Sequence, residues 1–582
     1  MPKNNRNIWG KILLVGGLYT VVFLISASHF WESDGIKIYG DEIGYWRNAA
    51  LLTGRDWSGE ASSNAYYGFG YGFLLMPILF FLNEKPDIMM HAAIIMQSLM
   101  LASCIIAAWL ILEKLDIDIK QSGKAIILLF SVLYPSNIFY TKTTLSEILL
   151  STCVWWNSYF ALCYVQEKKV YQAIGLALVS VYMFSVHQRM LTTVVASFLL
   201  IMVITIIKRR EKMPIVAECI AWIAIFAVLF TAYQIYDAYY TNSLYSQAID
   251  GGRDVNRVST GLGNRIIMLK TMEGMLQLIK SLCGKIFYSF VASYGVIAIG
   301  IGSLTQNMIR ECKQKDKWGK NIWYIYLLLN FLGAIGASAL AMNGGFETRS
   351  DRLMYGRYSE YTYGPILLMG AITLYQVKQL KQKMILFNIV LITMLCVICV
   401  NNTFDYAPNS NFWVNCVALS DLVCKVQTNE LTNKGVVLMA TLRCIIVMGI
   451  LFGIGRLVKK YQSILINAVL AIIIVSWIYT MDVNWKRNVL PWYIPLQSGI
   501  DDMAENIENE DMVITLDATL SGCFQFRLPN VSVKICSSIE EIPNYTDKIF
   551  VITDTSSEYA IYIREHYTVD KENEKYIRWI FE

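Results

Sequence analysis

An adjacent pair of acidic residues lies early in the chain, just after its first apolar run. Asp41 and Glu42 belong to the segment YGDEIGYWRNAALLTG. Acids in the first turn of a helix are stabilised by the helix dipole, which is the structural interpretation. The catalytic interpretation is a carboxylate that takes a proton from a hydroxyl as that oxygen attacks an electrophilic carbon. Since neighbouring helical residues point about 100° apart, we expect one base, Asp41, with Glu42 as a helper rather than a facing acid pair.

Cations suited to binding an anion occur in two later segments. MFSVHQRML is a tight turn between apolar runs, and its guanidinium could either reach the membrane surface or bind phosphate oxygens. NGGFETRSDRLMYGRYSEYTYGP carries several arginines on a side where cations are disfavoured, which favours an anion site there. The residues predicted to bind a phosphate are Arg357, Tyr358, His187, Arg189 and Arg352.

Two other segments add candidates of mixed character. SNIFYTKTTLSEILL brings Lys142 and Glu147 to the same membrane boundary, where they could simply pair with each other. The Gly- and Tyr-rich segment SSNAYYGFGYGFLLMPILFFLNEKPD ends in an apolar run too short to span a bilayer, so we expect it to lie at the interface. Its Tyr66 and Tyr67 could stack on a sugar, although anchoring at the headgroups is the simpler interpretation.

Several common chemistries lack their usual motifs. The sequence has no Walker loop, no GxGxxG after a strand, no GxSxG and no Cys/His cluster with zinc spacing. Most of the 13 cysteines lie in apolar runs, where a thiol packs as a small hydrophobic group. Cys416 with Cys424, and Cys523 with Cys536, could each form a disulfide on an oxidising side, but spacing alone does not decide this.

The elements that must position these residues are membrane helices. Of the 582 residues, 55% are hydrophobic and only 16% are charged, a composition that a set of soluble domains does not have. About thirteen apolar runs have roughly the length that spans a bilayer. They lie near 11–28, 88–112, 124–142, 145–166, 170–186, 190–207, 215–236, 286–309, 321–342, 358–376, 384–400, 436–455 and 462–481.

Charge distribution predicts the orientation. Alternate loops between the apolar runs hold clusters of Lys and Arg, as in KRREK at 208–212 and RECKQKDKWGK at 310–320. Such loops are cytoplasmic by the positive-inside rule. Thirteen crossings then place the N-terminus in the cytoplasm and the last hundred residues outside a plasma membrane. The outer side receives the segments 29–87, 237–285 and 402–435 and the tail from 483, and two of its long loops also carry arginines.

The tail has the pattern of a small α/β domain. The stretches DMVITLD, VSVKICS, KIFVITD and KYIRWIFE predict short strands separated by acidic helical or turn segments. The tail is acidic, which makes nucleic acid an improbable partner. We therefore predict a transmembrane domain over 1–482, with interfacial helices in the outer loop 29–87, and an extracytoplasmic α/β domain over 483–582.

Taken together, these motifs resemble the GT-C superfamily of membrane glycosyltransferases, which use polyprenyl-phosphate-linked sugars and include the protein mannosyltransferase and aminoarabinose transferase branches. The resemblance spans essentially the whole chain. It rests on the pair Asp41-Glu42, on FGYGFLLMPIL after it, on TTLSE, and on GRYSEYTYGP with Arg357, Tyr358 and Pro365. One departure is Gly68-Phe69-Gly70, where many members read Pro-Pro-Gly.

The resemblance implies a GT-C-like fold and a function. Asp41 would be the catalytic acid-base residue and Arg357 a ligand of the donor phosphate. The expected reaction is an inverting transfer of a sugar from a polyprenyl-phosphate donor to a glycan, lipid or protein acceptor of the cell envelope. Since Arg and His suffice for a lipid monophosphate, we expect no obligatory cofactor, although a diphosphate donor would often call on a divalent cation.

Two alternatives from the sequence remain open. A membrane polysaccharide polymerase or ligase would use the same lipid donors and outer arginines. A transporter of lipid-linked or small anionic substrates would place ionisable groups near the bilayer midplane and often show a repeated hydropathy pattern, and no such repeat is evident.

Overall fold

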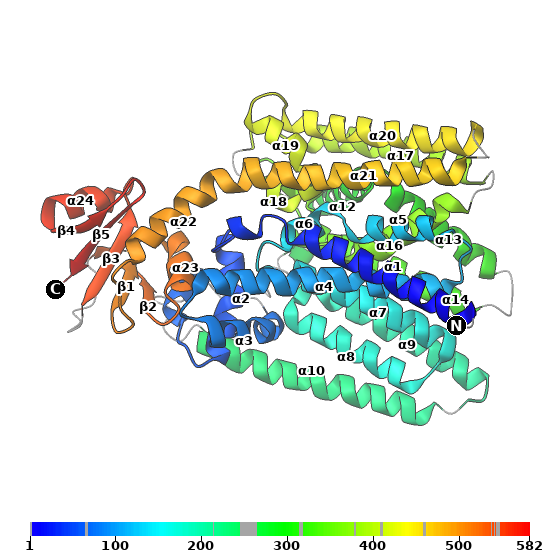
Figure 1. The fold of residues 1–582 in the computed structure, drawn as a ribbon, viewed down its shortest axis with the longest axis horizontal. Helices are drawn as coiled ribbons and strands as arrows, with labels where there is room; N and C mark the ends of the chain where they lie inside the picture. Colours follow the sequence, from blue (N-terminus) through cyan, green and yellow to red (C-terminus); the bar gives the residue numbers. More distant parts are fainter. Residues whose placement is uncertain are drawn as a thin grey trace.

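A computed structural model gives the fold of the chain (Figure 1). The structure describes residues 3–581 except 64–67, 214, 245–264, 313–317, 377–379, 408–410, 458–460, 537, 540–541 and 543–547. A long helical body carries a small sheet at one end, and the two termini lie at opposite ends of the molecule (Figure 1).

Most helices of the body fall on the predicted apolar runs, but the helix at 272–292 lies mostly in the segment 237–285, which the sequence predicts to be an outer loop. The helices of the body are α1 (Lys3–Ser26), α4 (Pro86–Leu115), α5 (Gln121–Val132), α7 (Glu147–Glu167), α8 (Val170–Val186), α9 (Leu191–Arg210), α10 (Val216–Leu244), α12 (Met272–Ala292), α13 (Val296–Cys312), α14 (Trp318–Ala341), α16 (Tyr363–Tyr375), α17 (Leu380–Asn402), α20 (Asn433–Leu457) and α21 (Gln462–Asn484). Within the described residues, nine helices are long and apolar enough to cross a membrane. The count of thirteen crossings and the orientation of the termini stay predictions.

Two of the predicted runs are divided by local backbone geometry. The run 124–142 contains α5 and the short helix α6 (Pro135–Tyr140), which begins at a proline. The run 286–309 covers the end of α12 and most of α13. Between those helices Tyr294 and Gly295 have φ of 51° and 83°, values that end a right-handed helix. A side chain at Gly295 would also meet Met448.

Short helices gather at the end of the body that carries the sheet (Figure 1). They are η1 (Phe30–Glu32), α2 (Tyr39–Leu52), η2 (Ser58–Ser63), η3 (Phe69–Tyr71), α3 (Gly72–Leu82), η4 (Gln188–Met190), α15 (Asp351–Met354), η5 (Glu360–Thr362), α18 (Phe412–Asn415), η6 (Val417–Leu419) and α19 (Ser420–Gln427). With 11 residues, α3 is too short to span a bilayer, as the sequence predicts.

One helix runs on from the body toward the sheet. α21 continues through a π-helical turn, η7 (Trp485–Val489), into α22 (Leu490–Ala504), so that 462–504 form one helix of 43 residues. Prolines at 491 and 495 follow the π turn, and such turns accommodate a disturbed hydrogen-bond ladder. The domain boundary expected at residue 483 therefore falls inside a continuous helix.

The small domain is a mixed sheet, and its predicted strands are confirmed. The strands β1 (Met512–Thr515), β2 (Ser532–Ile535), β3 (Ile549–Asp554), β4 (Val569–Glu572) and β5 (Tyr576–Phe581) have the order β2-β1-β3-β5-β4. β1 is parallel to β2 and β3, whereas β5 is antiparallel to β3 and β4. The sequence pattern does not predict β4, because VDKE is a charged edge strand with little apolar character. The helices α23 (Ala518–Arg527) and α24 (Glu558–His566) complete the domain.

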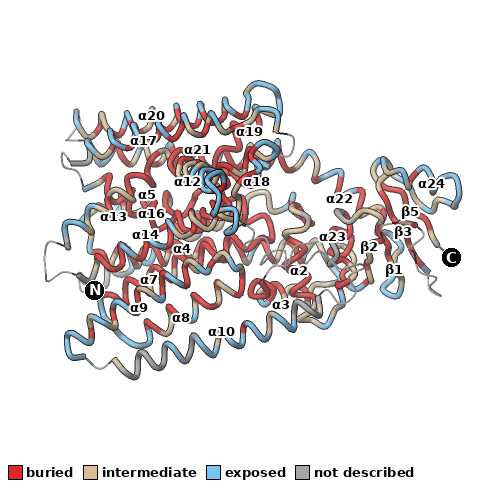
Figure 2. The backbone as a smooth tube through the Cα atoms, turned by 180° about the vertical axis from the view of Figure 1, so that it is seen from behind, coloured by how far each residue is buried: buried red, intermediate tan, exposed pale blue. Residues whose placement is uncertain are grey.

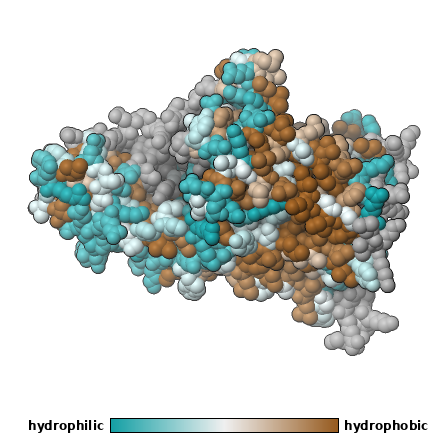
Figure 3. Space-filling view, turned by 90° about the horizontal axis from the view of Figure 1, so that it is seen from above, coloured by the Kyte–Doolittle hydropathy of each residue, from teal (hydrophilic) through white to brown (hydrophobic). Residues whose placement is uncertain are grey.

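The distribution of buried and exposed residues fits a membrane body. Red, buried segments lie where helices face one another (Figure 2), while brown, hydrophobic atoms cover much of the visible outside of the helical body (Figure 3). Leu13, Phe387 and Ile472 are among its exposed large apolar residues. The four cysteines considered for disulfides, 416, 424, 523 and 536, are buried and not disulfide-bonded. Burial among apolar neighbours, rather than pairing, accounts for them.

Candidate functional site

The two acids of α2 point to different surroundings. The Glu42 carboxylate is fully buried and accepts hydrogen bonds from the backbone N–H of Lys37 (2.9 Å) and Ile38 (2.7 Å). It also accepts from the N–H (2.6 Å) and the Oγ1 hydroxyl (2.7 Å) of Thr144. Glu42 thus starts the helix and ties it to the segment before α7, which matches the structural interpretation of an acid in a first helical turn. In the structure it serves to position α2 rather than to face a substrate.

Asp41 lies on the open side of the same helix. Its side chain is 31% exposed, and its Oδ2 accepts a hydrogen bond of 2.5 Å from Nη1 of Arg357, whose side chain is 7% exposed. Nε of the same guanidinium donates to Oε1 of Glu147 at 2.8 Å. The structure therefore brings together residues from three separate sequence motifs, 41, 147 and 357, through one arginine.

Local structure holds this arginine in place. The N–H groups of Gly356 and Arg357 both donate to the carbonyl of Asn415, at 2.8 and 3.2 Å. Gly356 packs so closely on Tyr288 that a Cβ there would lie 2.1 Å from its ring, which explains the glycine. Glu147 is the first residue of α7, where the helix dipole favours an anion.

A second guanidinium shares the same carboxylate oxygen. Nη2 of Arg189 donates to Oε1 of Glu147 at 3.0 Å, and its Cζ lies 4.9 Å from the ring centre of Tyr358 and 5.5 Å from that of Tyr361. Among the described residues, Nε and Nη1 of Arg189 are buried without a hydrogen-bond partner, and so is Oε2 of Glu147. Buried donors of this kind are normally satisfied, so this guanidinium has capacity for another acceptor.

His187 completes this side of the cluster. Its Nδ1 accepts the backbone N–H of Arg189 at 3.2 Å, and its ring centre lies 6.0 Å from that of Tyr358. Burial, followed by the charge of Arg189, lowers the pKa of His187 well below its ordinary value. The imidazole is therefore neutral, and Nε2 carries the proton that can be donated.

The charges of the cluster are mutually stabilised. Burial opposes the charge of Arg357, but the carboxylates of Glu147 and Asp41 hold its pKa well above the ordinary value. The two arginines 189 and 357 face the two carboxylates 41 and 147. Such an arrangement can bind a phosphate through paired guanidinium groups and holds a carboxylate beside it.

Arg352 lies near a further cation, Arg265, which the sequence motifs did not single out. Nε of Arg352 is buried without a hydrogen-bond partner among the described residues. Burial lowers the pKa of Arg265. Tyr358 acts in the opposite direction, and the positive charge of Arg352 lowers the pKa further. The signal for Arg265 was its place in an outer loop that carries arginines on the side where cations are disfavoured. Arg349, in contrast, forms an ion pair with Asp351, with 2.6 Å between Nη2 and Oδ2.

Lys142 does not join the cluster. Lys142 is fully buried, and its Nζ donates to the carbonyls of Ser26 (3.0 Å) and Ile138 (2.9 Å), which joins the end of α1 to α6. Of the two interpretations left open by the sequence, the structure does not show the pair of Lys142 with Glu147, because Arg189 and Arg357 bind Glu147. Tyr66 and Tyr67 lie outside the described residues.

The α2 helix is held from behind by contacts with two parts of the chain. Tyr45, one helical turn after Asp41, shares a hydrogen bond of 2.7 Å with the Ser146 hydroxyl. On another face, α23 of the small domain packs on α2, where the rings of Trp46 and Phe526 lie 5.2 Å apart. The sheet domain thus supports the helix that carries Asp41.

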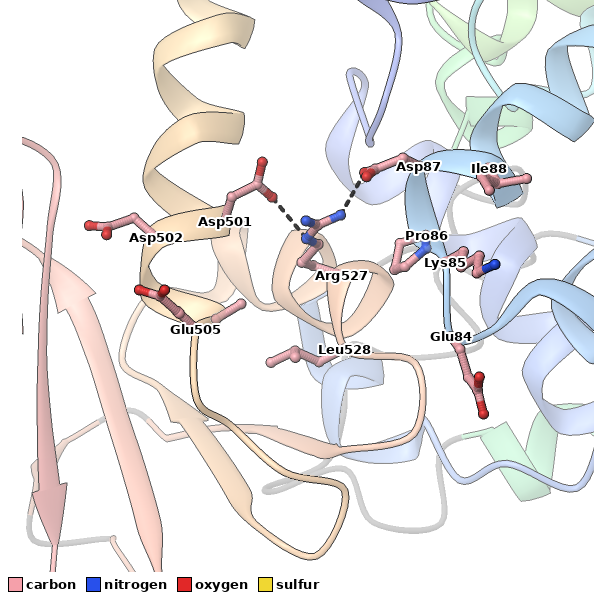
Figure 4. Close-up of a pocket in the computed structure, with 11 residues that line it drawn as sticks. Glu84, Lys85, Pro86, Asp87, Ile88, Asp501, Asp502, Glu505, Arg527 and Leu528 are labelled. Carbon is pink, nitrogen blue, oxygen red and sulfur yellow. Dashed lines mark hydrogen bonds and ion pairs between the residues drawn. The ribbon is translucent and has the colours of Figure 1, made fainter.

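A separate acidic cleft lies where the small domain meets the start of α4 (Figure 4). It has a volume of about 700 Å³ and includes Glu84, Asp502 and Glu505 in its lining. Arg527 crosses it, with Nη1 2.5 Å from Asp87 and Nε 2.8 Å from Asp501. In the part of the chain that the structure describes, no group of three or more His, Cys, Asp or Glu is placed to hold a metal ion.

Comparisons with known proteins agree with this architecture. No protein-family model matches the sequence, and no curated protein matches it significantly. Among solved structures, the chain is similar to ArnT from Cupriavidus metallidurans bound to undecaprenyl phosphate, with a TM-score of 0.54, 9% identity and 98% coverage of both chains. The apo form of that protein gives a TM-score of 0.53, 9% identity and coverage of 99% of this chain and 98% of ArnT.

A more distant likeness is to the oligosaccharyltransferase AglB from Archaeoglobus fulgidus in complex with an inhibitory peptide and a dolichol-phosphate. Its TM-score is 0.39 at 10% identity, with coverage of 95% of this chain and 71% of that one. The likeness to ArnT extends over the helical body and the small domain alike. The chain therefore shares its overall fold with ArnT.

Proposed function

We propose that the chain is a glycosyltransferase that moves a sugar from a polyprenyl-phosphate donor to a cell-envelope acceptor at the outer membrane face. The observation that carries this proposal is the Arg357 guanidinium, which Glu147 and Asp41 share while Arg189 lies alongside. Paired guanidinium groups suit a phosphate, and a neighbouring, partly exposed carboxylate suits a base. The likeness to ArnT, whose structure holds undecaprenyl phosphate, supports a lipid-phosphate donor.

The proposed reaction is a single displacement. Asp41 takes the proton of the acceptor O–H as the acceptor oxygen forms a bond to the anomeric carbon. The bond from that carbon to the phosphate oxygen breaks, and the lipid phosphate leaves with the electron pair. Arg357 and Arg189, with His187 as a neutral donor, stabilise the charge that develops on this oxygen. One displacement inverts the anomeric carbon, and the arginines perform this stabilisation without an obligatory cofactor.

The transfer itself is the test. Purified chain in lipid nanodiscs is incubated with polyprenyl-phosphate-linked sugars and extracts of cell-envelope lipids and glycans as acceptors. We expect labelled sugar to move to an acceptor with inverted configuration, measured by mass spectrometry and NMR. Asp41→Asn should lower turnover by roughly a hundredfold or more, since it removes a base without changing shape. Full turnover by Asp41→Asn would end the assignment of the base, and a lack of transfer from every polyprenyl-phosphate sugar would refute the proposed function.

The proposal requires the cluster to face the outside of the cell. Ser556 lies exposed in the small domain, and Ser122 lies exposed at the start of α5, near the opposite end of the helical body. In intact cells, a Ser556→Cys variant should react with a membrane-impermeant thiol reagent, while Ser122→Cys should react only after permeabilisation. The reverse pattern would place the site on the cytoplasmic side.

A further inference from the structure

The two carboxylates on Arg357 differ in how easily a ligand could replace them. Glu147 is 6% exposed, sits at the dipole-stabilised start of α7 and holds Arg189 as well. Asp41 is 31% exposed and binds the other end of the guanidinium, at Nη1. An anion that enters from the open side therefore meets Asp41 first, and it would have to disturb two ion pairs to replace Glu147.

Asp41 also has conflicting tasks. While Oδ2 of Asp41 accepts a hydrogen bond of 2.5 Å from Nη1 of Arg357, that oxygen is occupied and is not open to the proton of an acceptor hydroxyl. A phosphate that accepts from the same nitrogen would release this oxygen. Arg357 is thus both the group that would bind the donor phosphate and the group that restrains the base, Asp41.

We propose that the lipid phosphate, when it binds, replaces Asp41 as the acceptor of the hydrogen bond from Nη1 of Arg357. Glu147 continues to accept the hydrogen bond from Nε. Glu147 is then a positioning residue, which fixes Arg357 and Arg189 on either side of one oxygen. Asp41 becomes competent as a base only when the donor is in place. The donor must accordingly bind before the acceptor is activated.

The exchange makes an unusual prediction about affinity. If Asp41 competes with phosphate, Asp41→Asn removes the competitor and should bind polyprenyl phosphate more tightly than the wild type does. The expected gain is about tenfold or more, the size of a charge-assisted hydrogen bond that no longer has to be broken. A purely catalytic Asp41 would leave affinity unchanged, and a merely structural one would weaken it. Glu147→Gln should weaken binding, because the two guanidinium groups lose the anchor that they share.

The experiment measures binding of undecaprenyl monophosphate to the full-length chain in nanodiscs, by calorimetry, for wild type, Asp41→Asn and Glu147→Gln. Asp87→Asn is the matched control, since it removes an acid from the other bridging arginine, Arg527, at the same end of the molecule. Asp41→Ser serves if Asp41→Asn fails to fold. Inorganic phosphate, tested alone, shows whether the headgroup suffices or the lipid tail is needed.

The outcomes separate this inference from the function on which it rests. Tighter binding by Asp41→Asn alone, with weaker binding by Glu147→Gln, supports the exchange. Unchanged or weaker binding by Asp41→Asn overturns it, as does an equal gain in Asp87→Asn, which would reflect net charge only. If wild type binds no polyprenyl phosphate at all, the proposed function falls as well. If binding follows the prediction but no sugar is transferred, the exchange stands and the glycosyltransferase proposal does not.

Discussion

Two arginines in this protein make nearly the same contacts in different surroundings. Arg357 and Arg527 each donate through Nη1 to one carboxylate at 2.5 Å and through Nε to another at 2.8 Å. The Arg357 side chain is 7% exposed and the Arg527 side chain 24%, and the carboxylates of the latter, Asp87 and Asp501, are 48% and 39% exposed. Solvent screens the charges around Arg527 more than those around Arg357. The same hydrogen-bond geometry therefore gives ion pairs of different strength at the two sites.

The comparison indicates which of the two charge clusters is suited to bind a ligand. Around Arg527, water reaches every partner, and the bridge can only help to join α23 and α22 to the start of α4. Around Arg357 and Arg189, Glu147 is buried and Asp41 is less exposed than either partner of Arg527, and donors of Arg189 remain without acceptors among the described residues. A buried charge set that leaves unfilled hydrogen-bond capacity is expensive, and it is typical of a ligand site.

Removing one acid from each bridge should give the largest contrast. Glu147→Ala leaves two buried guanidinium groups short of a counter-charge, and breaking a buried pair in this way costs about 3 to 5 kcal/mol. Asp501→Ala should cost about 1 kcal/mol or less, because its side chain is 39% exposed. Denaturant unfolding in detergent measures both free energies. Equal losses in the two variants would show that burial does not distinguish the bridges.

Removing the arginines should separate the bridges in activity. Arg357→Ala should lower sugar transfer by roughly a hundredfold or more, because a buried donor to a developing phosphate charge is lost. Arg527→Ala should keep turnover within about twofold of wild type, since it breaks only a screened surface bridge. Initial rates under saturating donor provide the measurement. A comparable loss in Arg527→Ala would instead make the acidic cleft part of the catalytic machinery.

A conservative replacement should sharpen the comparison further. Arg357→Ala should weaken binding of polyprenyl phosphate by about 1.5 to 3 kcal/mol, and Arg357→Lys should restore only part of this, since an ammonium cannot reproduce the planar fork. Arg527→Lys should have no effect on that affinity. Unchanged donor binding in Arg357→Ala would move the phosphate site elsewhere, with His187 and Arg189 next in line.

The smallest expected effect concerns pH. Burial lowers the pKa of His187 well below 6.5 in the folded chain, so below pH 6.5 the unfolded chain binds a proton that the folded chain refuses. The contribution of His187 is therefore present above pH 6.5 and is lost as the pH falls. The wild type should lose more stability between pH 7.5 and 5.5 than His187→Gln does, as measured by thermal unfolding. An identical loss in both would place His187 in contact with water.

The sequence by itself determined the kind of protein and the segments that carry its chemistry. Apolar length predicted most helices of the body, because a bilayer demands long apolar runs. Short apolar stretches separated by acidic helical or turn segments predicted four of the five strands, while the charged edge strand 569–572 lacked that signal. Most of the predicted phosphate-binding residues do gather around Glu147, since their motifs all fall at one end of the helical body.

Only the tertiary structure decided which residues meet. Asp41 and Glu42 are equivalent in the sequence, yet one reaches Arg357 and the other is enclosed by Lys37, Ile38 and Thr144, because successive helical side chains point in different directions. The sequence likewise could not reveal that Glu147 pairs with arginines rather than with Lys142, or that the small domain packs on α2. Such pairings depend on the packing of distant helices, which local pattern and composition do not encode.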